Sequence, residues 1–186
     1  MQLIRPAALA AVFAFVATMS FAEKRPPKLA VGDVPPTYVG REFNGPNLTL
    51  DLKSGKAYVV SFWASWCGPC LQELPVLHNI QAKVGSDRMQ VIAVNVEDVD
   101  VYKKLRRYVR ELGLTTTFDP DREAREAYGV GNIPHMVIIG RDGKVSAVRV
   151  GYSDASLEAL ADALNRALSA PPPASADPAP GAAGGQ

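Results

Sequence analysis

The sequence lacks several features that would each have pointed to a particular class of protein. Its formal net charge is only +1, so the strong positive bias typical of nucleic-acid-binding proteins is missing. It has no internal repeat, and its 186 residues correspond to one ordinary domain. Its only two cysteines stand three positions apart, and a bridge across so short a loop stabilises a fold little. We therefore expect a single globular domain that does not bind nucleic acid and is not held together by disulfides.

The apolar stretch near the start, residues 7–22, is shorter than the ~20 residues that cross a membrane. Arg5 precedes it, and Ser20 and Ala22 put small residues at the two positions that a signal peptidase recognises. This order predicts a signal peptide over residues 1–22. The alternative is an uncleaved anchor. Both interpretations imply export, so we expect a periplasmic protein, tethered to the membrane if the segment is retained.

The rest of the chain divides into residues 23–168, expected to form the domain, and residues 169–186. This last segment is mostly Ala, Pro and Gly and predicts a disordered tail. Apolar patterns predict strands at 48–52, 57–63, 89–96, 136–139 and 145–150, and helices at 71–84, 101–112, 121–128 and 157–168. This order favours an α/β fold in which a central mixed sheet carries helices on both faces.

The motif Trp66-Cys67-Gly68-Pro69-Cys70 directly follows the strand at 57–63, where α/β sheets tend to place their sites. Cys67 would begin a helix, whose free N–H groups and dipole lower a thiol pKa below the free value of ~8.5. The thiolate would attack a disulfide, and Cys70, one turn on, would resolve the mixed disulfide. Pro69 suits a first helical turn, and Gly68 leaves room for a substrate chain. Trp66 would cover the pair with apolar surface, so we expect all three to contact substrate.

Two segments resemble a known family. Residues 62–75, Phe-Trp-Ala-Ser-Trp-Cys-Gly-Pro-Cys-Leu-Gln-Glu-Leu-Pro, resemble the thioredoxin-like reductases of the TlpA, ResA and CcmG (DsbE) group. Residues 129–143, which contain Gly-Asn-Ile-Pro-His, resemble the segment that carries the cis-proline of that fold. The resemblance implies a thioredoxin-like fold with a cis Ile133–Pro134 bond. It also implies that Pro134 packs against the cysteines and that the backbone of Ile133 and His135 holds an extended substrate strand.

The same resemblance implies a function. It indicates a thiol–disulfide oxidoreductase that needs no cofactor and acts in cytochrome c maturation or copper-site assembly. The expected partners are an oxidised protein, such as apocytochrome c or a copper-site protein, and an upstream membrane dithiol that donates electrons. We expect a monomer. Cys-Gly-Pro-Cys is also the thioredoxin motif, whose potential of ~−270 mV favours reduction, against ~−120 mV for the oxidant DsbA. A disulfide isomerase or oxidase remains the alternative enzyme.

Two positions depart from the patterns of these relatives. Thioredoxins bear a buried Asp where this chain has Ser61, whereas Glu73 matches a Glu that ResA-like proteins keep near their cysteines. A carboxylate there could take the proton from Cys70 as a general base. The alternative is a solvated helix carboxylate. His135 stands where the family usually has Thr, and we expect it to place an imidazole near the pair.

This imidazole suggests a rival function. Cys67, Cys70 and His135 could bind Cu(I) or Zn(II) and make the protein a metallochaperone. A closed zinc site needs four ligands, and the remaining candidate, His78, is more easily explained as structural. We therefore predict no metal site.

Overall fold

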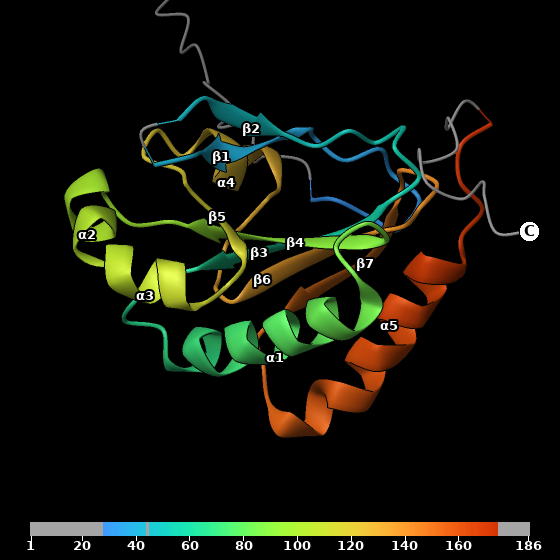
Figure 1. Ribbon diagram of the computed structural model, residues 1–186. Coiled ribbons are helices and arrows are strands. Elements are labelled where there is room, and N and C mark those ends of the chain that lie inside the picture. Colours follow the sequence, from blue (N-terminus) through green and yellow to red (C-terminus); the bar gives the residue numbers. More distant parts are fainter. Residues whose placement is uncertain (1–27, 44, 175–186) are drawn as a thin grey trace, which may run out of the picture.

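The computed structural model describes residues 28–43 and 45–174 of the chain, and both predicted terminal segments, residues 1–22 and most of 169–186, lie outside this part. Within it, one mixed sheet has the strand order β2-β1-β5-β4-β3-β6-β7. The elements, shown in Figure 1, are β1 (Tyr38–Arg41), β2 (Asn47–Thr49), β3 (Ala57–Trp63), α1 (Gly68–Val84), β4 (Met89–Asn95), α2 (Val99–Lys104), α3 (Arg106–Glu111), β5 (Thr115–Phe118), α4 (Glu123–Ala127), β6 (His135–Ile139), β7 (Val145–Val150), a 3-10 turn (Asp154–Ser156) and α5 (Leu157–Ser169).

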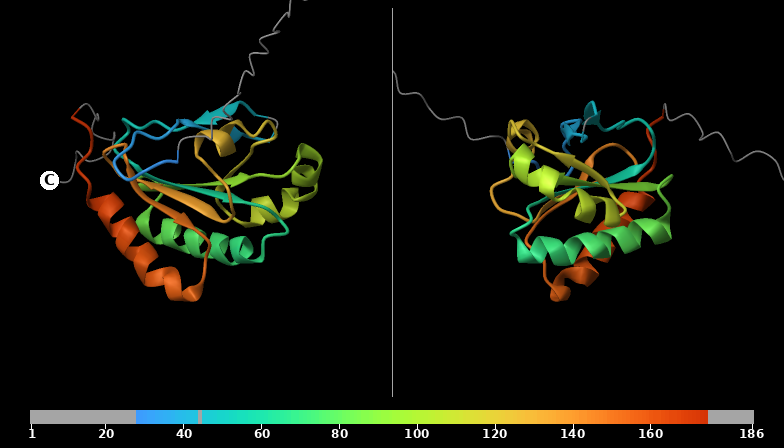
Figure 2. Two further views of the ribbon diagram at one scale, coloured as in Figure 1. Left: turned by 180° about the vertical axis from the view of Figure 1, so that it is seen from behind. Right: turned by 60° about the vertical axis from the view of Figure 1, so that its left-hand side comes forward.

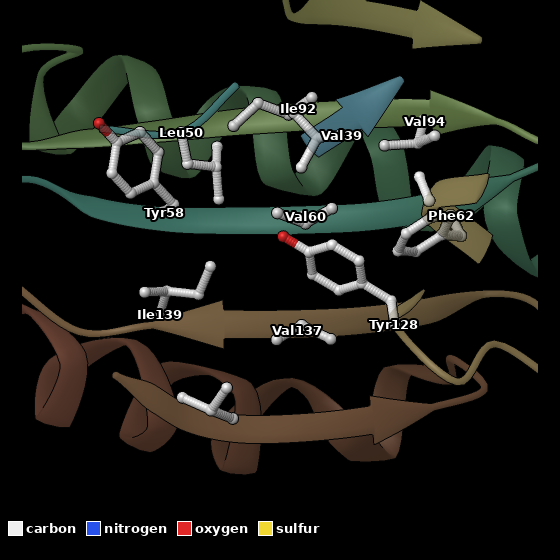
Figure 3. Close-up of a cluster of buried hydrophobic side chains, with 12 residues drawn as sticks. Val39, Leu50, Tyr58, Val60, Phe62, Ile92, Val94, Tyr128, Val137 and Ile139 are labelled. Carbon is white, nitrogen blue, oxygen red and sulfur yellow. The ribbon is translucent and has the colours of Figure 1, made fainter. Parts of the chain in front are cut away.

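The central strand β3 is buried on both faces. It pairs in parallel with β4 and antiparallel with β6, and every one of its residues is buried. Its side chains alternate between two apolar clusters, as strand geometry requires. Tyr58, Val60 and Phe62 join Tyr128 in the cluster of Figure 3, whereas Val59 faces the other side of the sheet.

Helices cover both faces of this sheet, which confirms the predicted fold class. α1 and α5 lie side by side on one face, with α3 beyond the first turn of α1 (Figure 1). On the opposite face, α4 packs beside the β1–β2 edge, which curls over the sheet (Figure 2). Among the described residues, no helix combines the length and the apolar character needed to span a bilayer.

The predicted single helix over 101–112 is wrong in one respect, because the chain breaks into α2 and α3 at Leu105. The Leu105 backbone has φ −83° and ψ 1°, and its N–H bonds the carbonyl of Tyr102 rather than that of Val101. The break lets an aromatic side chain on each side of it pack against the sheet. Tyr102 stacks on Phe118, with ring centres 4.9 Å apart, while Tyr108 packs against Trp63 at 5.7 Å.

Two strands were missing from the sequence prediction, and the strand expected at 48–52 occupies Asn47–Thr49 instead. β5 is a four-residue run of three threonines and a phenylalanine without apolar alternation. β1 contains Gly40 at φ 95°, where an added Cβ would lie 2.8 Å from the Phe118 carbonyl oxygen. The close approach of β1 to β5 requires glycine here, and glycine hides the strand pattern.

Candidate active site

The cysteine pair lies where β3 passes into α1. Cys67 is the N-cap residue of α1, and its Sγ accepts a hydrogen bond from the backbone N–H of Cys70 at 3.3 Å. The two sulfurs are joined in a disulfide. Cys67 keeps 5% of its surface exposed, whereas Cys70 is fully buried. The first cysteine is therefore the one that a partner can reach, and the second lies behind it.

The residues between and before the cysteines face outward. Gly68 begins α1 and Pro69 is its second residue, where a missing N–H costs no hydrogen bond. A Cβ added at Gly68 would meet nothing within 4 Å, so the fold itself leaves this position open. Trp66 is 73% exposed, in contrast to Trp63, which is fully buried behind the pair. Trp66, Gly68 and Pro69 thus form an accessible rim beside Cys67.

Glu73 lies one turn after Cys70 and is buried, with only 2% of its surface exposed. The hydroxyl of Ser61 donates a hydrogen bond to its Oε1 at 2.7 Å. Burial raises the pKa of the Glu73 carboxyl to about 7, although the Ser61 hydrogen bond and the charge of Arg149 act in the opposite direction. The alternative of a solvated helix carboxylate is therefore wrong. A carboxyl with this pKa can accept or release a proton near neutral pH.

The second segment of the site comes from far along the chain. The Ile133–Pro134 bond is cis, as the family resemblance implied. Ile133 packs against the apolar cluster that contains Cys67, Cys70 and Trp63. Pro134 is buried, and its carbonyl accepts a hydrogen bond from the N–H of Gly151. The fold thus brings the start of β6 to the cysteine pair.

His135 does not place its imidazole beside the cysteines, which corrects the sequence expectation. It pairs with Phe62 across β3 and β6, and directly opposed residues share one face of a sheet. Ser61 and Glu73 belong to the other face. The ring packs edge-on to Phe62 at 6.2 Å, and neither ring nitrogen has a hydrogen-bond partner among the residues that the structure describes. Burial, and then the charge of Lys28, lowers the pKa of the His135 imidazole, which favours its neutral form.

The metallochaperone hypothesis loses its third ligand for the same reason. His135 points away from Cys67 and Cys70, and His78 lies in the middle of α1, beside Pro75 and Leu112. Within residues 28–43 and 45–174, no three His, Cys, Asp or Glu side chains gather closely enough to hold a metal ion.

A carboxylate that the sequence analysis missed holds the loop before Cys67. Glu97 accepts hydrogen bonds from the backbone N–H of Ser65 at 2.6 Å, from the Ser65 hydroxyl at 2.8 Å and from the Asn95 amide at 3.1 Å. Ser65 stands two residues before the exposed cysteine. Nothing in the spacing of Glu97 connects it to the motif 30 residues earlier, because the contact depends on the pairing of β3 with β4.

Comparison with known proteins agrees with this geometry. A model of the Redoxin family matches residues 30–164. The thiol-disulfide oxidoreductase ResA of Geobacillus thermodenitrificans is 30% identical over 125 residues, covering 66% of this chain and 71% of that protein. ResA of Bacillus thuringiensis is 29% identical over 133 residues, covering 70% and 75%. A crystal structure of a putative thiol:disulfide interchange protein DsbE from Chlorobium tepidum is 33% identical, with a TM-score of 0.66, and covers 76% of this chain and 99% of that one.

Proposed function

Since the chain belongs to the Redoxin family, has a thioredoxin-like fold and is a thiol–disulfide oxidoreductase of the ResA and DsbE type, we propose that it is an exported reductase of protein disulfides. The observation that carries this proposal is the position of Cys67 at the tip of α1, with the Cys70 N–H directed at its sulfur. The same N–H and the helix dipole would stabilise a Cys67 thiolate in the reduced protein.

The exchange then proceeds in two displacements. The Cys67 thiolate attacks one sulfur of the substrate disulfide, forms a mixed disulfide and expels the other substrate sulfur as a thiolate. Cys70 next loses its proton and attacks the Cys67 sulfur. This forms the Cys67–Cys70 bond and expels the second substrate thiolate. Two electrons have passed to the substrate, and an upstream dithiol must reduce the enzyme again.

Glu73 is the proposed base for the second displacement. Its carboxyl is buried one helical turn from Cys70 and has a pKa of about 7, close to the pH of a neutral medium. It can therefore take the proton of Cys70 when the resolving thiolate is needed, and release it afterwards. Ser61 holds the carboxyl in place through its hydrogen bond.

The substrate side of the site is proposed to be the rim of Trp66, Gly68 and Pro69 together with the segment from Ile133 to His135. The exposure of the rim supports this, as does the packing of Ile133 on the cysteine cluster. The buried His135 would contribute through its backbone only.

The proposed setting is the periplasm, with a membrane dithiol as electron donor and apocytochrome c or a copper-site protein as substrate. The pattern over residues 1–22 supports export, and the resemblance to the TlpA, ResA and CcmG group supports these partners.

The direction of reaction is testable by equilibrating the purified protein with glutathione buffers. A reductase with this motif should have a potential near that of thioredoxin, ~−270 mV. A potential near the ~−120 mV of DsbA would instead make the protein an oxidase.

The substrate is testable by trapping. In the Cys70→Ser variant, the second displacement cannot occur, so the substrate should remain disulfide-linked to Cys67 and be identified by mass spectrometry. Cys67→Ser is the matched control and should trap nothing. Equal trapping by both variants would contradict the assigned roles of the two sulfurs.

A further inference from the structure

The surface next to Cys67 is hollowed on both sides of Trp66. One hollow, of about 330 Å³, is lined by Trp66, Arg122, Arg125, Val130, Gly131, Asn132 and Ile133. The other, of about 380 Å³, is lined by Trp66, Val96, Glu97, Asp98, Val101 and Arg125. Trp66 and Arg125 line both. The first hollow, named here the arginine hollow, also contains Ile133, which connects it to the proposed substrate strand.

The arginine hollow carries positive charge that its own lining does not neutralise. In the described part of the chain, its lining includes two guanidinium groups and no carboxylate. Arg125 is fixed in place, because its Nη2 donates to the Val96 carbonyl at 3.0 Å. The one ion pair of Arg122 in the described part of the chain reaches Glu126 at 4.0 Å, between side chains that are 64% and 66% exposed. So long and exposed a pair contributes little and can exchange for a better partner.

The loop before α4 and α4 itself position these two arginines, because Arg122 is the N-cap residue of the helix and Arg125 lies within it. Arg122 has φ 63°, a left-handed conformation that is costly for a residue with a side chain and that tends to occur at functional sites. The buried Asp119 holds the loop, because its carboxylate accepts the N–H groups of Ala124 and Arg125 at 3.1 and 2.7 Å. Burial, and then the neighbouring charge of Arg122, lowers the pKa of the Arg125 guanidinium, whereas the charge of Asp119 acts in the opposite direction.

We propose that the arginine hollow binds an acidic side chain of the protein substrate, close to the disulfide that Cys67 attacks. This rests on the proposed function and specifies its substrate class: oxidised proteins with an Asp or Glu beside the reacting cysteine. Guanidinium groups bind carboxylates through paired, charge-assisted hydrogen bonds, and the exposed face of Trp66 supplies the apolar contact beside them. Arg122 and Arg125 thereby act as specificity-determining residues rather than catalytic ones.

The test uses three disulfide-bonded peptides that are identical except for a Glu, Gln or Lys next to one cysteine. With the full-length reduced protein at low ionic strength, the second-order rate constant for reduction of the Glu peptide should exceed that for the Gln peptide about tenfold, and the ratio should shrink in high salt. Arg122→Glu should reverse the order of the Glu and Lys peptides. Arg122→Gln, which removes one of the two charges and keeps a polar side chain, should reduce the preference, and it keeps the test valid if the charge-reversal variant fails to fold.

Lys144→Glu is the matched control, because it makes the same charge change on an exposed residue beyond the opposite end of β6. It should keep the wild-type ratio. Equal rates for the three peptides would overturn the acidic preference while leaving the dithiol reaction intact. A preference for the Lys peptide would overturn it too, and would point to Glu97 and Asp98 on the other side of Trp66. Failure to reduce any of the peptides, or to exchange with glutathione, would remove the proposed function as well.

Discussion

Glu73 is the residue whose environment departs most from its ordinary chemistry. A carboxyl with one neutral hydrogen-bond donor and almost no exposure is poorly stabilised as an anion, so its pKa rises from 4.5 to about 7. The folded state therefore binds its proton more tightly than the unfolded state does. The resulting stabilisation is fully present below pH 4.5 and is lost as the pH rises through 7.

We predict that Glu73→Gln removes this pH dependence. The amide keeps the shape and an acceptor for Ser61 but cannot ionise. At pH 8 the oxidised variant should be more stable than wild type by up to about 3 kcal/mol, because one pKa unit corresponds to about 1.4 kcal/mol. At pH 4 the difference should nearly vanish. Urea unfolding at the two pH values measures it, and a difference that does not change with pH would contradict the buried-carboxylate account.

At the scale of elements, the long apolar patterns were the informative ones. β3, α1, β4 and α5 were predictable because each has enough residues to show its period. β1 and β5 were not, since each is four residues long and is fixed by pairing with neighbouring strands. The break at Leu105 was hidden for a related reason. It is set by where Phe118 and Trp63 lie, and those positions are not encoded in the helix itself.

The conformation of the loop between β3 and α1 depends on a neighbouring segment, because Glu97, which follows β4, accepts hydrogen bonds from Ser65 in that loop. We predict that Glu97→Ala slows the reaction of the reduced protein with oxidised glutathione on the order of tenfold, because Cys67 would no longer be held at the helix tip. Stability should also fall by about 1–3 kcal/mol, since two Ser65 donors and one Asn95 donor lose their acceptor.

The rate of reaction with oxidised glutathione shows whether Glu97 positions Cys67 or only stabilises the fold. Glu97→Gln keeps one acceptor oxygen and should recover part of the rate. Glu111→Ala removes a carboxylate from an exposed pair with Arg107 on α3 and should change neither rate nor stability appreciably. If Glu97→Ala lost stability but reacted at the wild-type rate, Glu97 would be a structural residue only.

At the scale of the whole molecule, the fold brings together at the site segments that are distant in sequence. The Cys67–Cys70 motif and its place before α1 could be predicted from local chemistry, and the cis bond before Pro134 from family resemblance. The orientation of His135 could not, because a one-residue change of register would move it to the other face of the sheet. The arginine hollow could not be predicted from the sequence either, since Trp66 and Arg122 come together only in the folded chain.

The most direct measurement of the central claim is the pH dependence of alkylation of the reduced protein, followed separately at each cysteine by mass spectrometry. A thiol held at the start of α1 should react first and with an apparent pKa below the free value of ~8.5. We predict this behaviour for Cys67, with Cys70 protected at the same pH because it is fully buried. A midpoint at or above ~8.5 for Cys67, or equal reactivity of both cysteines, would contradict the account.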